Sequence, residues 1–321
     1  MPTENLLTRV TRDGLVAQAR QSIRKGSKSF AAASRLFERE TRERVWMLYA
    51  WCRACDDLAD AQDMGGALGP QQNAPARLAL IRERTALAFA GQATGDPAFD
   101  ALGLLATETP ITLAMANDVI EGFALDAREW RPRSEADMLR YCYHVAGAVG
   151  VMMAAVMGVP GEDDETLDAA CDLGLAFQLS NIVRDVWEDD AAGRCYLPIE
   201  WLVEADIPPG EVTKPHYRRA LVPMVARACE LARGYEASAR VGAARLRFRQ
   251  RWAVLSAANI YGAIGREVER LGAHAWDHRV HTTKAAKLGH VLRGLGQANA
   301  APAPAVRPSL GRRELASLGR T

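Results

Sequence analysis

The sequence lacks a strong net charge. Its 321 residues include 40 Lys and Arg against 39 Asp and Glu, a formal net charge of +1. A general nucleic-acid binder carries a clear basic excess, so this balance argues against one. Any site for phosphate groups must therefore be local. The most uneven segment is the last one, residues 296–321, where four Arg and one Glu give +3.

The sequence also lacks the run of about 20 apolar residues that crosses a bilayer. The longest apolar run, residues 145–158, has 14 residues with three Gly among them. It indicates a tightly packed core helix. The first residues, MPTENLLTRV, are too polar for a signal peptide, so we expect a cytoplasmic protein.

A disulfide framework is missing as well. The six Cys are scattered, and most lie in apolar helical contexts, as reduced thiols do. Cys52 and Cys55 have CxxC spacing inside a strongly helical run. Neither a second Cys pair for zinc nor a βαβ pattern for a redox motif accompanies them. We therefore expect no zinc or redox function.

Strand-like alternation is nearly absent, and helical periodicity dominates. Gly and Pro mark the breaks. Helices are expected at residues 13–25, 40–61, 75–92, 111–128, 135–158, 164–190, 213–245, 250–272 and 283–294. This pattern predicts one all-α domain over residues 1–295. The Ala/Pro-rich residues 296–321 lose the periodicity, and we expect them to be disordered.

Two acidic residues end the second expected helix. Asp56 and Asp60 continue an apolar stripe through Cys52 and Tyr49 rather than a solvated face. Their i, i+4 spacing puts the two Cβ atoms about 6 Å apart. Like charges at that distance repel and are costly to bury unless a cation lies between them.

The expected helix at 164–190 carries a second acidic pair. Six residues fall within an arc of about 100°; they are Ala170, Gly174, Gln178, Asn181, Asp185 and Asp189. This stripe changes from small to amide to carboxylate, which suggests a cavity wall, apolar at one end and metal-binding at the other. Carboxylates without His or Cys suit a hard cation such as Mg²⁺, which is typically held together with substrate phosphates. The pattern suggests a diphosphate ester with a hydrocarbon tail.

Five segments resemble the squalene/phytoene synthase family, most closely its bacterial phytoene synthases. They are residues 26–30 (GSKSF), 49–60 (YAWCRACDDLAD), 141–150 (YCYHVAGAVG), 173–198 (LGLAFQLSNIVRDVWEDDAAGRCYLP), and Tyr261 with Arg279 and Val280. The resemblance implies an isoprenoid-synthase-type helical bundle around a central cavity. It also implies a prenyltransferase of carotenoid biosynthesis, which joins two geranylgeranyl diphosphates head to head (1′-1) into phytoene through prephytoene diphosphate.

The same resemblance implies the roles of individual residues. Mg²⁺, or Mn²⁺ in its place, is assigned to Asp56, Asp60, Asp185 and Asp189. Tyr141 matches the catalytic tyrosine, and Arg184 joins it and the four aspartates in the catalytic set. Diphosphate and substrate binding is assigned to Ser27, Ser29, Phe30, Arg53, Gln178, Asn181, Arg194, Tyr261 and Arg279.

Two alternative functions and two further expectations remain open. A squalene- or dehydrosqualene-type synthase would use farnesyl diphosphate, with NADPH in the squalene case. A non-catalytic relative would keep the bundle as an assembly factor.

Small residues at 31–34 favour the longer substrate, and a bulky residue at Ser34 would favour the shorter one. A C40 product dissolves in lipid, so its release implies transient contact with a membrane surface, to which the basic tail would add.

Overall fold

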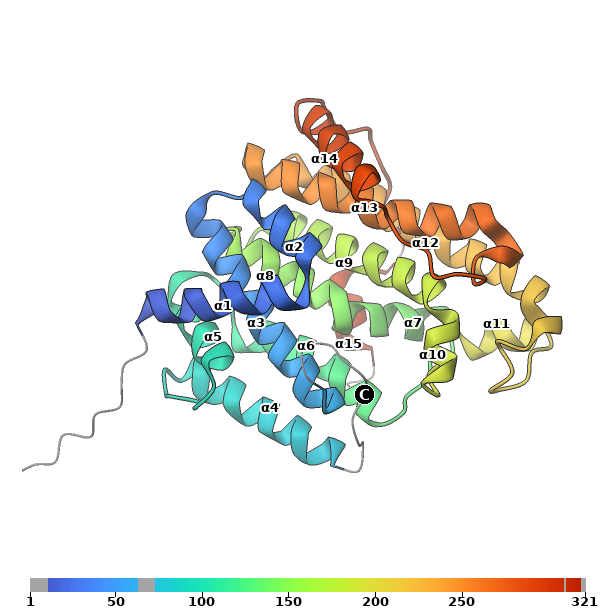
Figure 1. The fold of residues 1–321 in the computed structure, drawn as a ribbon, viewed down its shortest axis with the longest axis horizontal. Coiled ribbons are helices and arrows are strands. Elements are labelled where there is room, and N and C mark those ends of the chain that lie inside the picture. The colour runs from blue at the N-terminus through green and yellow to red at the C-terminus, as the bar shows by residue number, and fades with distance from the viewer. Residues whose placement is uncertain (1–10, 63–72, 309, 319–321) are drawn as a thin grey trace, which may run out of the picture. The chain divides into compact units, whose positions relative to one another are not determined.

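The computed structural model describes residues 11–62, 73–308 and 310–318 (Figure 1). These ranges contain helices and no strand, which confirms the all-α prediction. The main helices are α1 (Arg12–Gly26), α2 (Lys28–Ala33), α3 (Arg39–Asp60), α4 (Ala74–Phe89), α5 (Pro97–Glu108), α6 (Leu113–Ala127), α7 (Glu135–Cys142), α8 (Ala148–Val156), α9 (Asp164–Arg184), α10 (Val186–Ala191), α11 (Ile199–Glu204), α12 (Arg218–Ala243), α13 (Phe248–Leu271), α14 (Lys284–Ala298) and α15 (Arg312–Ser317). Short turns of other helix types are η1 (Ser34–Leu36), η2 (Tyr143–Gly147), η3 (Pro215–Tyr217) and η4 (Gly272–His274).

Every expected helix has a counterpart, but the short helices α2, α11 and α15 and the longer α5 were not expected. The signal for α5 is present in the sequence. Asp96 caps the helix by accepting a hydrogen bond from the backbone N–H of Ala98, and Pro97 opens the first turn. A cap residue followed by proline is a typical helix start.

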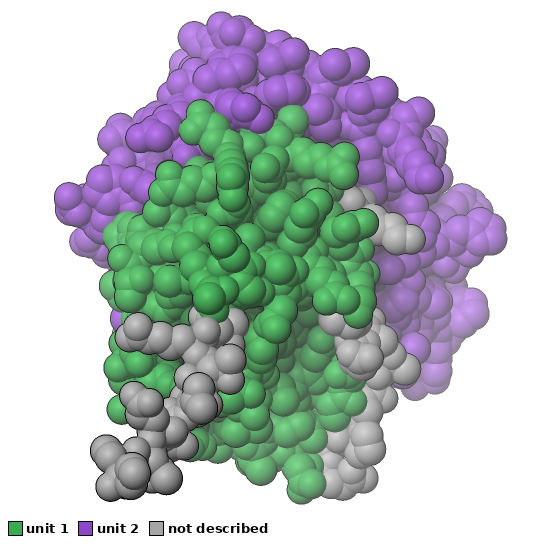
Figure 2. Space-filling view, turned by 60° about the vertical axis from the view of Figure 1, so that its left-hand side comes forward, with its two compact units in different colours: residues 1–113 green, residues 114–321 purple. Residues whose placement is uncertain are grey.

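The chain divides into two compact units, Met1–Leu113 and Ala114–Thr321 (Figure 2). The single domain over residues 1–295 stays a prediction. In unit 1, α3 packs against α1, α4 and α5. The middle of α3 belongs to the core, since Val45, Met47 and Trp51 are fully shielded from solvent.

In unit 2, α9 packs against η2, α8, α12 and α13 (Figure 1). Glycines allow the closest approach: a Cβ on Gly174 would lie 2.3 Å from the carbonyl oxygen of Ala146, and one on Gly150 would lie 2.2 Å from that of Ala170. The cavity-wall interpretation of Gly174 is thereby corrected. Its small size is required by backbone packing between η2 and α9.

The apolar run at 145–158 belongs to a continuous helical stretch made of α7, the π-helix η2 and α8. By length and composition alone, Glu135–Val156 is apolar enough to cross a membrane, with a mean hydropathy of 1.3. In the structure 67% of the most apolar 18-residue window of this stretch is buried inside the protein, as in a packed core helix.

The prediction of a disordered tail is wrong for the described residues 296–308 and 310–318. α14 continues to Ala298, and α15 buries Leu315 completely. Arg307 pairs with the buried Asp172 at 2.9 Å, and Arg312 pairs with Asp168 at 2.8 Å. Local composition cannot reveal partners 135 to 144 residues away in the sequence.

Candidate active site

The first acidic pair ends α3. Because α3 is continuous to Asp60, Asp56 and Asp60 lie one turn apart, as the spacing predicts. The Nη1 of Arg53 donates a hydrogen bond to Asp56 at 2.5 Å and lies 3.9 Å from Asp57. Arg53 therefore pairs mainly with a predicted metal ligand, and this places a fixed positive charge beside the carboxylates.

The segment with Ser27, Ser29 and Phe30, which were assigned to substrate binding, forms α2 and its N-cap. The hydroxyl of Ser27 accepts a hydrogen bond from the backbone N–H of Phe30 at 3.2 Å and caps this helix. The Phe30 ring meets the Tyr49 ring edge-on, with centroids 5.7 Å apart. The side chain of Ser29 lies outside the described part of the structure. Within unit 1, then, Phe30 is linked through Tyr49 to the helix that carries the acidic pair.

The second acidic pair lies at an interruption. The expected helix at 164–190 is broken at Asp185, where φ is −100° and ψ is 16°; α9 ends before this residue and α10 begins after it. The backbone N–H of Asp189 still donates to the carbonyl of Asp185 at 2.8 Å. The two aspartates therefore keep the one-turn relation that the spacing predicted.

Arginines hold Asp185 on both carboxylate oxygens. Arg279 donates to Asp185 through its Nε and Nη2 at 2.9 and 3.0 Å. Arg184 forms a second ion pair with Asp185 through its own Nε and Nη2. Burial acts to raise the pKa of Asp185, but the two guanidinium groups outweigh it and lower the pKa below its usual value. Asp185 is therefore a carboxylate at neutral pH.

Asp189 is the opposite case. Burial, followed by the nearby charge of Asp185, raises the pKa of Asp189 to about 7, against the opposing effect of Arg194. Arg194 also approaches through its backbone, whose N–H donates to the Asp189 carbonyl at 2.8 Å. A buried carboxylate beside another one favours a bound cation.

Two further predicted residues, Gln178 and Asn181, lie on α9, and Tyr261 contacts α9 from α13. The side-chain amide of Asn181 donates to that of Gln178 at 3.4 Å. Tyr261 on α13 stacks on Phe177 with ring centroids 4.1 Å apart. Sequence reasoning missed Trp276, whose indole N–H donates to the carbonyl of Val183 at 3.0 Å next to the break in α9.

Tyr141 belongs to a buried aromatic cluster. Its phenol donates to Asp126 at 3.1 Å, and the phenol of Tyr196 donates to the other oxygen of the same carboxylate at 3.0 Å. The two rings stack at 4.5 Å. Burial, and then the charge of Asp126, raise the pKa of Tyr141 well above its usual value. Sequence reasoning missed Asp126, which lies in α6 without a helix-spaced partner in the motifs.

The donor chemistry fits a hard cation. Within each unit, taken by itself, two Asp lie one helical turn apart, and oxygen donors of this kind suit Mg²⁺. No group of three or more metal-binding side chains occurs in the part of the chain that the structure describes. The six Cys are free, and burial raises the pKa of the Cys52 thiol to about 12.

The helical architecture has close counterparts among solved structures. A dehydrosqualene synthase superposes with a TM-score of 0.78 at 26% identity, covering 89% of this chain and 96% of that one. The squalene synthase HpnC from Alicyclobacillus acidocaldarius gives 0.72 at 25% identity, with 81% and 95% covered. The protein therefore has the isoprenoid-synthase helical fold.

The family model of squalene/phytoene synthases matches residues 23–286. The chain belongs to this family. A phytoene synthase from Pseudescherichia vulneris is 45% identical over 296 residues, which cover 92% of this chain and 95% of that protein. A 15-cis-phytoene synthase from Pantoea ananas is 46% identical over 286 residues, covering 88% and 92%.

Proposed function

We propose that this protein is a phytoene synthase, an enzyme that joins two molecules of geranylgeranyl diphosphate head to head into phytoene and releases diphosphate. The carrying observation is 45–46% identity to phytoene synthases along nearly the whole of both chains. The acidic pairs, their arginines and the buried Tyr141 are the groups that such a reaction needs.

The chain's own residues suit the two ionisation steps. Asp56 with Asp60, and Asp185 with Asp189, would hold Mg²⁺, which would supply the positive charge that neutralises the diphosphate as it leaves. Arg53 and Arg194 add fixed positive charge near these pairs and offer forked donors to phosphate oxygens. The phenol of Tyr141 remains protonated because burial and Asp126 disfavour the phenolate. It therefore acts as a neutral hydrogen-bonding group beside the cationic intermediates.

Product analysis tests this assignment. Purified protein with Mg²⁺ is incubated with geranylgeranyl or farnesyl diphosphate, with and without NADPH. We expect a C40 hydrocarbon from the C20 substrate without NADPH. A C30 product would instead place the enzyme in the squalene or dehydrosqualene branch, and no product from folded protein would favour a non-catalytic assembly role.

A matched pair of variants tests the metal ligands. Asp189→Asn removes a proposed ligand, whereas Glu188→Gln removes a neighbouring carboxylate whose side chain is 48% exposed and lies 3.7 Å from Arg279. We expect diphosphate release to fall at least about 100-fold in the first variant and to stay within a few-fold of wild type in the second. Equal losses in both would contradict the assignment.

We also propose a cytoplasmic enzyme that contacts a membrane surface when it releases product. The tail is a poor candidate for that contact, because Arg307, Arg312 and Arg313 already pair with acids on α9. α14 is a better one: Leu288 and Leu292 lie one turn apart and are 62% and 59% exposed. Vesicle co-sedimentation of Leu288→Asp/Leu292→Asp against wild type checks this, and equal binding would contradict it.

A further inference from the structure

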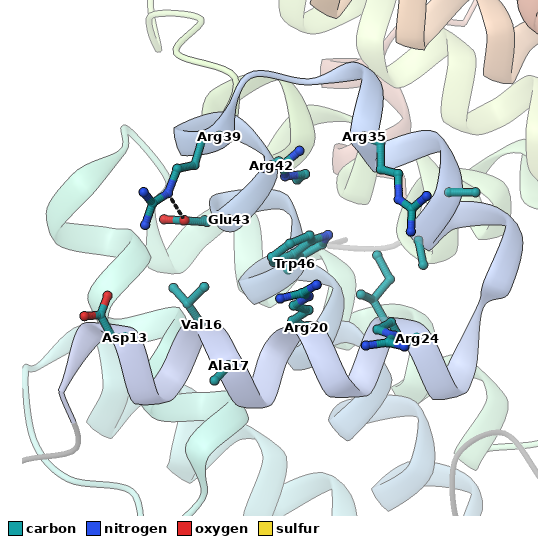
Figure 3. A pocket seen from close by; sticks show the side chains of 13 residues that line it. Asp13, Val16, Ala17, Arg20, Arg24, Arg35, Arg39, Arg42, Glu43 and Trp46 are labelled. Carbon is teal, nitrogen blue, oxygen red and sulfur yellow. Dashed lines mark hydrogen bonds and ion pairs between the residues drawn. The ribbon is translucent and has the colours of Figure 1, made fainter.

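A pocket outside the proposed active site lies in unit 1. It is formed by α1, by α2 with η1, and by the first turns of α3, and its volume is about 870 Å³ (Figure 3). Five arginines line it, and we call it the arginine pocket; they are Arg20, Arg24, Arg35, Arg39 and Arg42. Asp13 and Glu43 are its only acidic lining residues. In a chain whose net charge is +1, this is a marked local excess.

The arginines around this pocket divide into two groups. Arg12 and Arg44, on the same helices, both pair with Glu108, at 2.7 and 3.1 Å, and Arg39 pairs with Glu43 at 2.8 Å. By contrast, Arg20, Arg24 and Arg42 form no ion pair with any residue in the described ranges. The Nε of Arg42 is buried without a hydrogen-bond partner in the structure.

Two of these guanidinium groups lie close to the ring of Trp46. The guanidinium carbon of Arg20 lies 5.7 Å from the centre of its ring and that of Arg42 lies 5.5 Å from it. The indole is itself fixed, because its N–H donates to the hydroxyl of Ser34 at 2.9 Å. In Figure 3, Arg35 and Arg24 lie at the same end of the pocket. Like charges are thus held together from three elements.

We propose that the arginine pocket binds an anion that carries phosphate groups. Grouped guanidinium donors match phosphate oxygens in pairs, and the bound anion relieves the repulsion among them. The volume falls within the range of pockets that enclose small ligands. The acids lie beside Arg39, which leaves Arg20, Arg24 and Arg42 for the ligand. This inference does not depend on the proposed catalytic function.

The chemistry is shared by free phosphate compounds and by lipid headgroups, and the test separates them. The full-length protein, in buffer without phosphate, sulfate or Mg²⁺, is titrated calorimetrically with inorganic diphosphate. In parallel it is sedimented with phosphatidylcholine vesicles made with and without phosphatidylglycerol. Arg20→Gln/Arg42→Gln is compared with Arg219→Gln/Arg247→Gln, which removes two exposed arginines of unit 2.

We expect the pocket variant to lose at least about tenfold in affinity, a factor equivalent to 1.4 kcal/mol, while the control variant matches wild type. A loss seen with diphosphate identifies a soluble ligand, and a loss seen only with phosphatidylglycerol vesicles identifies a headgroup; either supports the proposal. Equal affinities in the two double variants, or no binding of either probe by folded wild type, would overturn it. Diphosphate binding at the active site affects both variants alike and cancels in the comparison.

Discussion

Tyr141 shows how burial determines what a single side chain does. Its phenol donates to a carboxylate that Tyr196 shares, and its pKa lies well above the usual value. A group in that state donates a hydrogen bond at neutral pH and does not accept a proton as phenolate. The identity of the motif residue came from the sequence, but its protonation state follows from Asp126, 15 residues away on another helix.

Tyr141→Phe is therefore expected to lower kcat by about tenfold or more, because one hydrogen bond beside the reaction is lost. The shape of the pH profile between pH 7 and 10 should not change, since the wild-type phenol does not ionise in that range. Steady-state kinetics on both proteins measure this. If wild-type kcat changed with pH between 7 and 10 and that change disappeared in the variant, the phenol would titrate in this range and the prediction would be wrong.

Ser34 controls space at the end of α2. It is fully buried, donates to the carbonyl of Ala31 at 2.9 Å and accepts the indole N–H of Trp46. Ser34→Phe is expected to raise the ratio of C30 to C40 products, because Ser34 lies one helical turn beyond Phe30 and a ring there takes up space that the longer chain needs. Overpacking costs about 1–3 kcal/mol, so a melting curve accompanies the product analysis. Ser34→Ala removes the same hydrogen bonds without adding bulk, and a changed ratio in that control would contradict the volume argument.

Among the elements, the tail is held by charge. Asp172 is fully buried, and burial raises its pKa even though Arg307 and Ser238 both donate to it. Arg307→Ala leaves that carboxylate without its cation, so we expect a loss of about 3 kcal/mol in unfolding free energy at pH 7. Chemical denaturation of the two proteins measures the difference.

The pH dependence has a definite sign. Because the pKa of Asp172 is raised in the folded state, its contribution to stability is complete below the unfolded pKa and is lost as pH rises through the folded pKa. Removing Arg307 raises the folded pKa further, so the deficit should be smaller at pH 5 than at pH 7. Arg313→Ala breaks a pair whose partners are 77% and 46% exposed and should cost under about 1 kcal/mol. An equal cost for both variants would refute the role of burial.

What the sequence could predict at this scale depends on where the information lies. The start of α3 and its acidic end follow from local periodicity, as does most of α9. The break at Asp185 does not follow from local periodicity, because it occurs where Asp185 binds Arg279, 94 residues away in the sequence. Likewise the small size of Gly174 suggested a cavity wall, whereas its cause is the backbone of Ala146 on a neighbouring segment. Contacts between distant segments are absent from any local pattern.

For the whole molecule, a near-zero net charge conceals three separate concentrations of charge. Arginines accompany one member of each acidic pair, Asp56 and Asp185. Arginines of the tail neutralise the acids of α9. In the arginine pocket, Arg20, Arg24 and Arg42 form no ion pair with any residue in the described ranges. Net charge argues against a nucleic-acid binder, but only the spatial distribution of charge separates internal pairing from sites for ligands.

This distribution predicts how the protein responds to metal removal. Because Asp56 and Asp185 have arginine partners, the fold itself does not need a metal ion to offset these two charges. EDTA is therefore expected to abolish diphosphate release while it changes the melting temperature by less than about 2 °C. Excess Mg²⁺ should restore activity, and EDTA already loaded with Mg²⁺ is the control. A large drop in melting temperature would make the metal structural, and activity that survives chelation would remove metal from the proposed mechanism.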